Sequence, residues 1–475
     1  MLNKVYDAVI VGGGVIGVSV FSEMVLNGYS CALVEKELDV SVGTTKANSG
    51  IIHAGYDAEP GTLKAKFNVQ GNKLFPSICE RLNVELKKCG AYVIGDNESI
   101  IDKLLSRGRT NGVTGLHKLD RTKLQKELPH IADNITWGLK ADNSYIIDPY
   151  FYTICLAEEA VLNGGEIFFN YDLKKVLYKD GVYILSNGLE SIQAKYIINC
   201  AGAGYNNVAK ILGTEIYETE FRRGEYYVLD HSEKDIVPST VFPMPSDAGK
   251  GVLVTPTVSG NILVGPTSYV SDDKTITTNA GLKDISAKVS NMLKNVNLGK
   301  TIRIFSGVRS ICGKDFVVEK SKKASNIINI AGICSPGLSS APAIAKYVFK
   351  LCGFVENAKI KLKPLPPYTK LGNLSLVEKN KLIKKNADYG KIICKCEGIS
   401  LGEIKDAINR PIRPTTMDGI KRRVRAGMGR CQGGFCNDKV AQIIASENNI
   451  FLSEVVKEKV GGNYIVGNIS ARGEK

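Results

Sequence analysis

The sequence lacks the long apolar runs that would place it in a membrane. No stretch of its 475 residues approaches the ~18–20 apolar residues of a membrane-spanning helix. The first residues, MLNKVYDAVIVGGG, run directly into an apparent core strand, so we expect no signal peptide. Twelve cysteines without such a signal are typical of a reducing cytoplasm, where thiols stay free or bind metal. The sequence therefore predicts a soluble cytoplasmic protein without a transmembrane segment, which would reach a membrane only through a partner.

The sequence also lacks an even distribution of charge. Residues 361–475 contain 22 Lys and Arg against 11 Asp and Glu, whereas the rest of the chain contains 40 against 37. The excess is concentrated in KRRVRAGMGR, Lys421–Arg430, which is either a solvated helix face or a docking surface for an acidic partner. We favour docking. Because no aromatic residues are interleaved for base stacking, we expect no nucleic acid partner.

What the chain does contain at its front is a glycine-rich turn between two apolar strands. In DAVIVGGGVIGVSVFSEMVLNGYSCALVEKE, a strand is followed by a turn, a helix and a second strand. Gly12, Gly14 and Gly17 fit G-x-G-x-x-G, which allows the tight turn, the close approach of pyrophosphate and tight helix packing. Glu35 stands where an acid binds a ribose hydroxyl. The unit predicts a dinucleotide site without deciding between NAD and FAD.

Later segments favour a long, extended cofactor. GTTKANSGIIHAGYDAEPGTLKAK, Gly43–Lys66, is rich in the small and hydroxyl residues that suit a backbone wrapped around such a molecule. YIINCAGAG, Tyr196–Gly204, is typical of a buried strand ending in glycines beside the cofactor. Ser335–Gly337 precedes an Ala-rich helix, whose N-terminus suits an anionic flavin, although Pro-Gly is also an ordinary helix start.

These segments resemble the FAD-dependent oxidoreductases of the D-amino-acid oxidase and glycerol-3-phosphate dehydrogenase superfamily. The matching stretches are TTKANSGIIHAG, IIDPYFYTICLAEEAVLNGGEI, KYIINCAGAGYNNVA, RRGEYYVLD, GVLVTPTVSGNILVGPT and AGICSPGLSSAPAIAKYV, in the family's order over about residues 5–350. The resemblance implies FAD as cofactor. In addition to the glycine motif and Glu35, the residues expected to bind it are Thr44, Thr45, Asn48, Ser49, Gly50, Val176, Gly202, Ser335, Gly337, Leu338 and Ser339.

Candidate catalytic residues follow from what a flavin dehydrogenase must do. It removes a hydride from carbon and a proton from the adjacent hydroxyl or amine. Of four histidines only His53 lies in a segment near the cofactor, where the resembling N-S-G-x-x-H-x-G pattern favours a general base over a packed or capping histidine. Arg309 is the candidate for binding an anionic substrate group, with a structural salt bridge as its alternative. Lys250 and Tyr226 are weaker substrate-binding candidates, more typical of edge or core positions.

Four paired cysteines near the end of the chain form a candidate metal site. Cys394 and Cys396 form C-x-C, and Cys431 and Cys436 form C-x4-C. Tetrahedral zinc more often uses pairs spaced by two to four residues, whereas four thiolates around two irons form a 2Fe-2S cluster. CKCEGIS and GIKRRVRAGMGRCQGGFC closely resemble the bacterioferritin-associated ferredoxin-like 2Fe-2S domain. We therefore expect a 2Fe-2S cluster, with zinc next and free thiols last.

The expected fold class is α/β. Between the flavin segments, EYYVLD, GVLVTP and NILVGPT are short β runs typical of an antiparallel sheet that covers the flavin and shapes the substrate pocket. We expect a Rossmann-like FAD-binding domain interleaved with this antiparallel-sheet substrate domain, plus a small helical C-terminal iron–sulfur domain. The expected boundaries are 1–85, 145–211 and 301–355 for the FAD-binding domain, 86–144 and 212–300 for the substrate domain, 356–384 for a Pro- and Lys-rich linker, 385–445 for the 2Fe-2S domain and 446–475 for a tail.

The fused cluster suggests what happens to the electrons. Flavin accepts two electrons at once and a cluster passes them singly, so we expect export to a protein acceptor, such as a second flavoprotein or a membrane-associated subunit. The combination resembles the anaerobic glycerol-3-phosphate dehydrogenases, which implies oxidation of sn-glycerol 3-phosphate to dihydroxyacetone phosphate. NSGIIHAGYDAEPGTLKA also resembles the L-2-hydroxyglutarate enzymes, so a 2-hydroxy acid or an amine is the alternative substrate. A noncatalytic iron–sulfur scaffold is a third hypothesis, against which the intact glycine motif, Glu35 and His53 speak.

Overall fold

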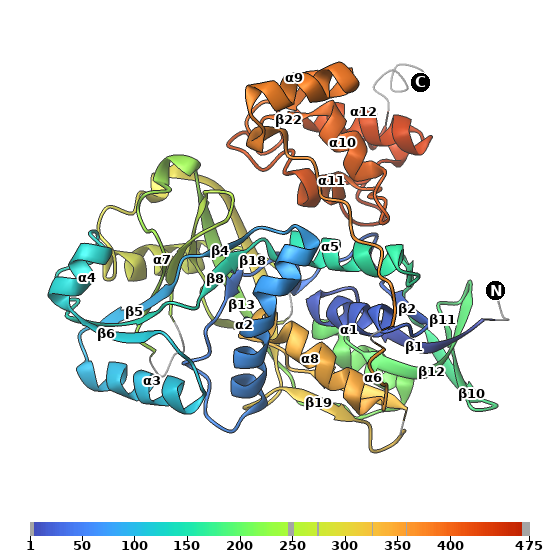
Figure 1. Ribbon diagram of the computed structural model, residues 1–475, viewed down its shortest axis with the longest axis horizontal. Helices are drawn as coiled ribbons and strands as arrows, with labels where there is room; N and C mark the ends of the chain where they lie inside the picture. Colours follow the sequence, from blue (N-terminus) through green and yellow to red (C-terminus); the bar gives the residue numbers. More distant parts are fainter. Residues whose placement is uncertain (1–3, 246–250, 273–274, 325, 358, 468–475) are drawn as a thin grey trace, which may run out of the picture.

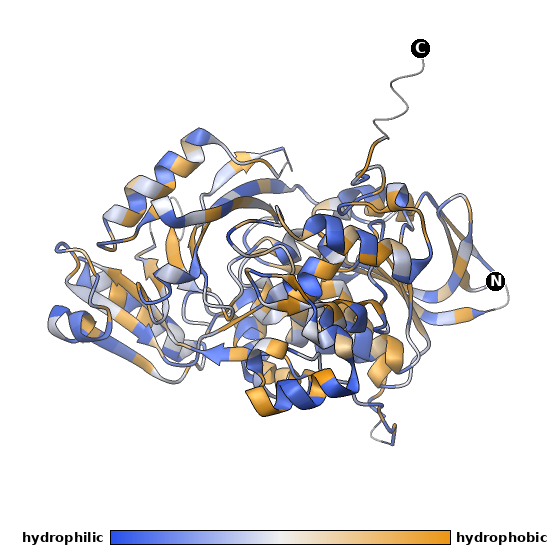
Figure 2. Ribbon diagram, turned by 90° about the horizontal axis from the view of Figure 1, so that it is seen from above, coloured by the Kyte–Doolittle hydropathy of each residue, from blue (hydrophilic) through white to orange (hydrophobic). Residues whose placement is uncertain are grey.

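The computed structural model describes residues 4–245, 251–272, 275–324, 326–357 and 359–467. Two large sheets with their covering helices form the main body, and a small helical unit at the end of the chain sits on top of it (Figure 1). In Figure 2 the peripheral helices carry hydrophilic and hydrophobic bands, as expected for helices with one face on a core. Within the described part of the chain, no helix combines the length and the apolar character needed to cross a membrane.

The first sheet has eight strands around β1. Its centre is parallel, and β1, β2 and β12 are buried apolar runs because helices cover both faces of a parallel sheet. The second half of β12 pairs with β20, and its first half pairs with the hairpin strand β11. The strands are β1 (Val5–Val11), β2 (Cys31–Val34), β9 (Glu166–Phe168), β10 (Lys175–Lys179), β11 (Val182–Ser186), β12 (Ser191–Asn199), β19 (Val317–Lys320) and β20 (Ile327–Ala331).

Five helices accompany this sheet, and their packing forms the largest apolar core. α1 packs against α5 and α8, and α8 also packs against α2. The Thr62 side chain accepts a hydrogen bond from the Ala65 N–H and so caps α2. The helices are α1 (Val15–Leu26), α2 (Leu63–Leu82), α5 (Pro149–Leu162), α6 (Tyr205–Leu212) and α8 (Gly337–Leu351).

The second sheet has nine mostly antiparallel strands and forms the other half of the body. It contains β5 (Ala91–Gly95), β6 (Leu116–Asp120), β7 (Trp137–Ala141), β13 (Glu220–Leu229), β14 (Thr240–Pro243), β15 (Leu253–Pro256), β16 (Ile262–Gly265), β17 (Tyr269–Ser271) and β18 (Thr301–Ile311), with α3 (Glu98–Thr110), α4 (Arg121–Glu127) and α7 (Asn279–Ser290) beside it. A third, smaller sheet contains β3 (Ile51–Ile52), β8 (Tyr145–Ile147) and β4 (Leu86–Lys88), with β8 in the middle.

The long strand β18 corrects one expected boundary. It pairs along most of β13, from Glu220 opposite Ile311 to Leu229 opposite Thr301. We expected the substrate domain to end at residue 300 and the FAD-binding domain to resume at 301. Because β18 pairs with β13, residues 301–311 belong to the sheet of the substrate domain instead. The α/β class with an added antiparallel sheet is confirmed.

The C-terminal domain is a small helical unit with its own apolar core. Ser400 and Glu403 form a capping box at the start of α10, and this helix ends at Ile408. Its elements are α9 (Leu376–Lys385), β21 (Ile392–Cys394), β22 (Ile399–Ser400), α10 (Leu401–Ile408), α11 (Met417–Val424) and α12 (Asn437–Asn448).

The segment expected as a tail is part of this domain. Val455 is fully buried in its core, and Val456 forms a bridge with Thr416. Glu458 pairs with Arg422 of α11 and with Lys46, which belongs to the segment near the glycine turn. Residues 450–458 therefore close the domain instead of trailing from it, because the apolar core formed by α10, α11 and α12 needs their side chains.

Candidate functional site

The glycine turn has the close backbone contacts that the motif predicts. Gly12 adopts φ +111°, and a Cβ there would lie 2.7 Å from the Cys200 carbonyl oxygen. A Cβ on Gly17 would lie 2.0 Å from the Gly12 carbonyl oxygen. Gly14 is different: it is the residue before α1, and its Cβ would meet only the Thr45 hydroxyl, at 3.4 Å. The fold itself therefore requires glycine at 12 and 17, whereas at 14 the open space suits a phosphate approaching the start of α1.

Glu35 lies beside this turn at the end of β2. Its carboxylate accepts the Gly13 N–H at 2.5 Å and the Glu37 N–H at 2.9 Å. Burial raises the pKa of Glu35, and the two N–H groups oppose that rise. Glu35 therefore lies at the carboxyl end of a parallel strand, which is the position expected for an acid that binds a ribose hydroxyl. The contact with the ribose stays a prediction.

The loop from Thr44 to Gly50 folds back over the start of α1. Thr45 accepts the Val15 N–H at 2.9 Å, and Asn48 accepts the Gly50 N–H at 2.8 Å while donating to the Thr45 carbonyl. Thr44 donates to the Val308 carbonyl of β18 at 2.8 Å. The structure thus brings five of the expected cofactor residues, Thr44, Thr45, Asn48, Ser49 and Gly50, into one loop between the glycine turn and the second sheet.

The start of α8 is joined to this loop through Ser339. Its hydroxyl accepts the His53 N–H at 2.8 Å and donates to the Ile51 carbonyl at 3.3 Å. Gly337 is the first residue of α8, and Ser335 lines a cavity with His53. The second helix N-terminus expected from the sequence therefore lies next to the histidine segment.

Two further cofactor candidates lie at different distances from the turn. Gly202 follows β12, and the neighbouring Ala201 Cα would lie 3.1 Å from a Cβ on Gly12. Val176 lies in β10, opposite Leu185, and β11 and β12 separate that strand from β1. The structure brings Gly202 to the turn and leaves Val176 on the outer hairpin.

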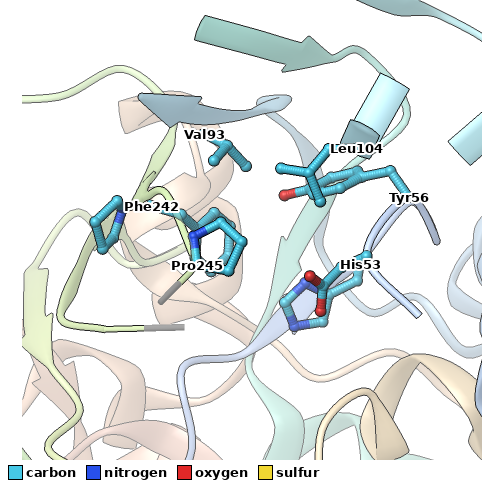
Figure 3. A pocket seen from close by; sticks show the side chains of 8 residues that line it. His53, Tyr56, Val93, Leu104, Phe242 and Pro245 are labelled. Atoms are coloured by element: carbon cyan, nitrogen blue, oxygen red, sulfur yellow. The ribbon is translucent and has the colours of Figure 1, made fainter. Parts of the chain in front are cut away.

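His53 lies between two cavities of contrasting character. One, of about 220 Å³, is lined by polar side chains that include Asp57, Lys64 and Ser335. The other is lined mainly by apolar side chains, among them Val93, Leu104, Phe242 and Pro245 (Figure 3), although Asp57 and Tyr56 line both cavities. The His53 backbone is held on both sides, by Ser339 at its N–H and by Asn72 at its carbonyl.

Sequence reasoning missed the two charged residues of the polar cavity. Asp57 and Lys64 stand within GYDAEPGTLKAK, a segment expected only to wrap the cofactor. The spacing from His53 was visible in the sequence, but nothing local showed that the chain turns back to put all three side chains on one cavity.

Tyr226 and Arg309 lie on the neighbouring strands β13 and β18, close to the loop. The Tyr226 hydroxyl is 3.1 Å from the Ser49 hydroxyl, and its buried ring stacks on Phe305. Burial raises the pKa of Tyr226, and the Arg309 charge opposes the rise. Arg309 donates to two neutral acceptors, the Thr267 carbonyl and the Ser268 hydroxyl, and no carboxylate of the described residues forms an ion pair with it. Lys250, the remaining substrate candidate, lies outside the described residues.

The four cysteine thiols come together in two pairs. The sulfurs of Cys396 and Cys431 are 3.6 Å apart at the surface, whereas Cys394 and Cys436 are buried and hydrogen-bonded to each other. No three described His, Cys, Asp or Glu side chains are arranged to hold a single metal ion. Four thiols in two pairs are the donor set that a 2Fe-2S cluster requires.

The two pairs also differ in electrostatic environment. Burial, followed by the charge and hydrogen bond of Cys394, raises the pKa of Cys436 to about 12. Burial also raises the pKa of Cys431, but the N–H groups of Phe435, Gly433 and Gly434 and the Cys396 thiol outweigh it and lower the pKa below the ordinary value. Backbone N–H groups thus already favour a thiolate at Cys431, as cluster ligation needs.

The basic run Lys421–Arg430 is exposed at its end, Arg430, whereas Arg422 and Arg423 in its middle are buried. Arg423 is fully buried and donates to both Asp39 oxygens, at 2.7 and 3.0 Å, and Arg422 donates to Asp39 at 3.0 Å. The nearby arginines lower the pKa of the Asp39 carboxyl in spite of its burial. For Arg422 and Arg423 the expectation of a docking surface was wrong, because α11 lies against the body and these two side chains face Asp39 of the same chain.

Arg425 connects the cysteine domain with both halves of the body. It donates to Glu397, next to Cys396, at 2.8 Å and to Asn261 of the second sheet at 3.2 Å. On the other side, the Tyr150 hydroxyl, just inside α5, lies 3.7 Å from the Met428 sulfur. The thiol loop is thereby fixed against the body at several points.

Together, the glycine cradle, the histidine cavity and the paired thiols define a flavin oxidoreductase with an iron–sulfur domain. Residues 7–351 match the family described as FAD dependent oxidoreductase, and residues 392–446 match the BFD-like [2Fe-2S] binding domain. The chain belongs to the FAD dependent oxidoreductase family, and its cofactors are FAD and a 2Fe-2S cluster.

Individual relatives narrow the comparison. The chain is 42% identical to the glycerol 3-phosphate dehydrogenase of Caloramator mitchellensis over 97% of its own length and 98% of that protein. The FAD-bound L-alpha-glycerophosphate oxidase of Mycoplasma pneumoniae superposes with a TM-score of 0.71 at 30% identity, covering 77% of this chain and 97% of that one. The mitochondrial L-2-hydroxyglutarate dehydrogenase of Caenorhabditis elegans is 30% identical over 66% of this chain and 72% of its own.

Proposed function

We propose that this protein is a dehydrogenase that oxidises sn-glycerol 3-phosphate to dihydroxyacetone phosphate and exports the electrons through its 2Fe-2S domain. The observation that carries the proposal is the arrangement of His53 on a polar cavity, next to the loop and helix that suit a flavin, in a chain that ends in paired thiols. Similarity to a glycerol 3-phosphate dehydrogenase over almost the whole chain, cysteine domain included, supports this substrate over a 2-hydroxy acid.

The residues assigned to the flavin fit an extended dinucleotide. The open space at Gly14 and the N-terminus of α1 suit the pyrophosphate, Glu35 the ribose, and the Thr44–Gly50 loop with the start of α8 the flavin end. When bound, FAD accepts the hydride from the substrate carbon. The start of α8 supplies N–H groups and a positive helix end for the negative charge that results.

The chain's own residues handle the proton and the phosphate. As the C–H bond of the alcohol carbon breaks, its O–H proton passes to the His53 imidazole and the carbonyl forms. Hydrogen bonds at both sides of the His53 backbone keep that base in place. Arg309, whose guanidinium donates to two neutral acceptors, binds the phosphate, and Tyr226 and Lys250 are proposed to assist.

The electrons leave one at a time to a protein. We infer an electron-accepting partner because one pair of the cluster thiols, Cys396 and Cys431, lies at the surface of a domain that is fixed to the flavin body. We also place the enzyme in the cytoplasm, since cluster assembly needs thiols that stay reduced.

A panel of substrates tests the proposal, with the absorbance of the protein's own cofactors as the readout. Protein prepared without oxygen is given sn-glycerol 3-phosphate, L-2-hydroxyglutarate or glycine, and bleaching of the flavin and then of the cluster absorbance is recorded. We expect both changes with glycerol 3-phosphate alone. Reduction by L-2-hydroxyglutarate instead would move the substrate to the 2-hydroxy acids, and stoichiometric zinc without iron would overturn the electron route while leaving the flavin assignment intact.

A further inference from the structure

The thiol loop presents only one of its two sulfur pairs to the outside. Cys394 and Cys436 are buried, whereas Cys396 is exposed and Cys431 is partly exposed. Gly433 and Gly434 follow Cys431 and add no side chain that would cover this pair. Any acceptor that takes electrons from the cluster must approach it closely, and the outer pair is where the chain allows that approach.

A single large apolar side chain stands beside the outer pair. Phe435, the residue before Cys436, is 84% exposed. An exposed aromatic ring is costly to leave in water, and aromatic residues are enriched among the few that carry most of the binding energy in protein interfaces. Among the described residues, the Phe435 ring stacks on no other ring and takes no part in the domain's apolar core, so its place next to the cluster points to a partner.

The exposed charges around Phe435 are mostly basic. Glu397 pairs with Arg425 and Asp230 with Arg430, whereas the exposed Asp438 carboxylate keeps its charge while accepting from the Tyr464 hydroxyl. Arg430 remains 74% exposed in spite of its ion pair. The exposed basic residues that flank the thiol loop are Lys395, Arg430, Lys439 and, from β18, Arg303, which donates to Gln432.

We propose that this exit surface, made of Phe435, the outer thiols Cys396 and Cys431, and the four basic residues Lys395, Arg430, Lys439 and Arg303, docks an acidic protein that carries one electron at a time. The proposal rests on the electron export proposed above. Transient electron-transfer contacts are small, so one ring within a basic rim is sufficient area. A lipid surface fits less well, because stable membrane attachment needs much more apolar area than one phenylalanine.

Two haem proteins of opposite charge provide the test. The full-length enzyme, loaded with both cofactors and reduced by glycerol 3-phosphate, is mixed with oxidised cytochrome b5, which is acidic, or with oxidised cytochrome c, which is basic. Each haem gains one electron, and the absorbance reports the rate. We expect faster reduction of the acidic protein at low salt, with the preference fading as salt shortens the screening length to ~8 Å and below.

Matched variants locate the contact. Phe435→Ala should lower the rate with the acidic haem protein roughly ten-fold, and Lys439→Glu should lower it while raising the rate with the basic one. Phe451→Ala removes a ring that is 78% exposed elsewhere on the same domain, and Lys381→Glu reverses a lysine of α9. Both control variants should behave as the parent, and all four should keep the cluster spectrum and the rate of flavin reduction.

Each outcome separates docking from the underlying function. If substrate never reduces the cluster in the parent protein, the electron export itself fails. If the cluster is reduced but Phe435→Ala and Lys439→Glu match their controls with both haem proteins, the exit surface is not where partners dock. Co-sedimentation of the parent with phosphatidylserine vesicles, lost in Phe435→Ala, would replace the protein partner with a lipid surface.

Discussion

The flavin site and the thiol site are built in opposite ways. The flavin site gathers short segments from along the chain, at Gly12–Gly17, Glu35, Thr44–Gly50 and the start of α8, and relies mainly on backbone groups. The thiol site draws on one small domain with its own apolar core and relies on four side chains. The first site therefore depends on the whole body being folded, and the second on a local unit. Each should be removable without the other.

The same contrast appears in the cysteines themselves. Cys200, at the end of β12 beside Gly12, has its pKa raised by burial alone, which keeps the thiol protonated. Cys431 meets N–H groups that lower its pKa. The two residues are of the same type, but their surroundings keep the Cys200 thiol protonated and favour the thiolate of Cys431, the form that a metal ligand needs.

The largest expected effect is loss of FAD in Gly14→Val. The isopropyl group would occupy the space assigned to the pyrophosphate, although the chain itself leaves room there. The purified variant should lack flavin absorbance and activity but keep the cluster spectrum and a normal unfolding curve. Gly372→Val, where a Cβ would meet nothing within 4 Å, is the control and should keep FAD. Full flavin content in Gly14→Val would remove the basis of the site.

Cys431→Ser should have the converse effect and remove the cluster while FAD stays bound. Loss of one outer thiol should abolish the cluster signal, while glycerol 3-phosphate still reduces the flavin and protein acceptors receive no electrons. Cys89→Ser, at a partly exposed cysteine of the body, should retain both cofactors. Iron content and the visible spectrum report the cluster, and an unchanged cluster in Cys431→Ser would contradict the assignment.

His53→Ala tests chemistry with both cofactors present. Flavin reduction in a single turnover should slow by roughly two to four orders of magnitude, as expected for loss of a general base, with FAD still bound. His117→Ala, at a surface histidine paired with Asp142, should not slow it. Equal rates for the two variants would leave His53 a structural residue.

Asp39→Asn tests whether the two sites are independent, because the ion pair of Asp39 with Arg423 connects the flavin-binding body to the C-terminal domain. Removing the carboxylate leaves Arg423 buried without a full counter-charge, and breaking such a pair costs about 3 kcal/mol. We expect a separate, earlier unfolding step for the C-terminal domain in calorimetry, which Asp133→Asn at an exposed ion pair should not produce.

The pH dependence of this pair has a definite sign. The pKa of Asp39 lies below its ordinary value of 3.8, so its contribution to stability is complete above that value and is lost as the pH falls below it. The parent should therefore release its C-terminal domain on acidification below about pH 4. In Asp39→Asn the loss of stability of the C-terminal domain on acidification should be smaller than in the parent. An equal loss in both proteins would assign it to other carboxyl groups.

The smallest effect is expected for Arg309→Lys. Lysine keeps the charge but not the fork of donors, so the KM should rise about ten-fold with little change in kcat, in line with ~1.5 kcal/mol for a charged hydrogen bond. Steady-state kinetics with glycerol 3-phosphate give the answer. A KM equal to the parent's would make Arg309 structural.

Local patterns carried most of what the sequence could predict. The glycine spacing and Glu35 depend on patterns close together in the chain, and the structure has them beside one another as expected. The two cysteine motifs also marked the thiol site, although the contact in it joins Cys396 of one motif to Cys431 of the other. Contacts between distant segments were not visible. Nothing in VRSIC, Val308–Cys312, showed that this strand pairs with β13. Nothing in KRRVR showed that its arginines would be buried and paired with Asp39, some four hundred residues earlier. A charge count cannot tell a surface from an interface.

The ion pair between Lys46 and Glu458 has a consequence for how the protein is made. Lys46 lies in the loop that wraps the cofactor, and its partner is translated only after almost all of the chain has left the ribosome. A nascent chain can complete the glycine turn early, but its cofactor loop gains this brace only at the end of synthesis. Flavin captured during translation would therefore be held loosely until the last domain docks, and shortening the gene before codon 458 would leave the loop in that unfinished condition.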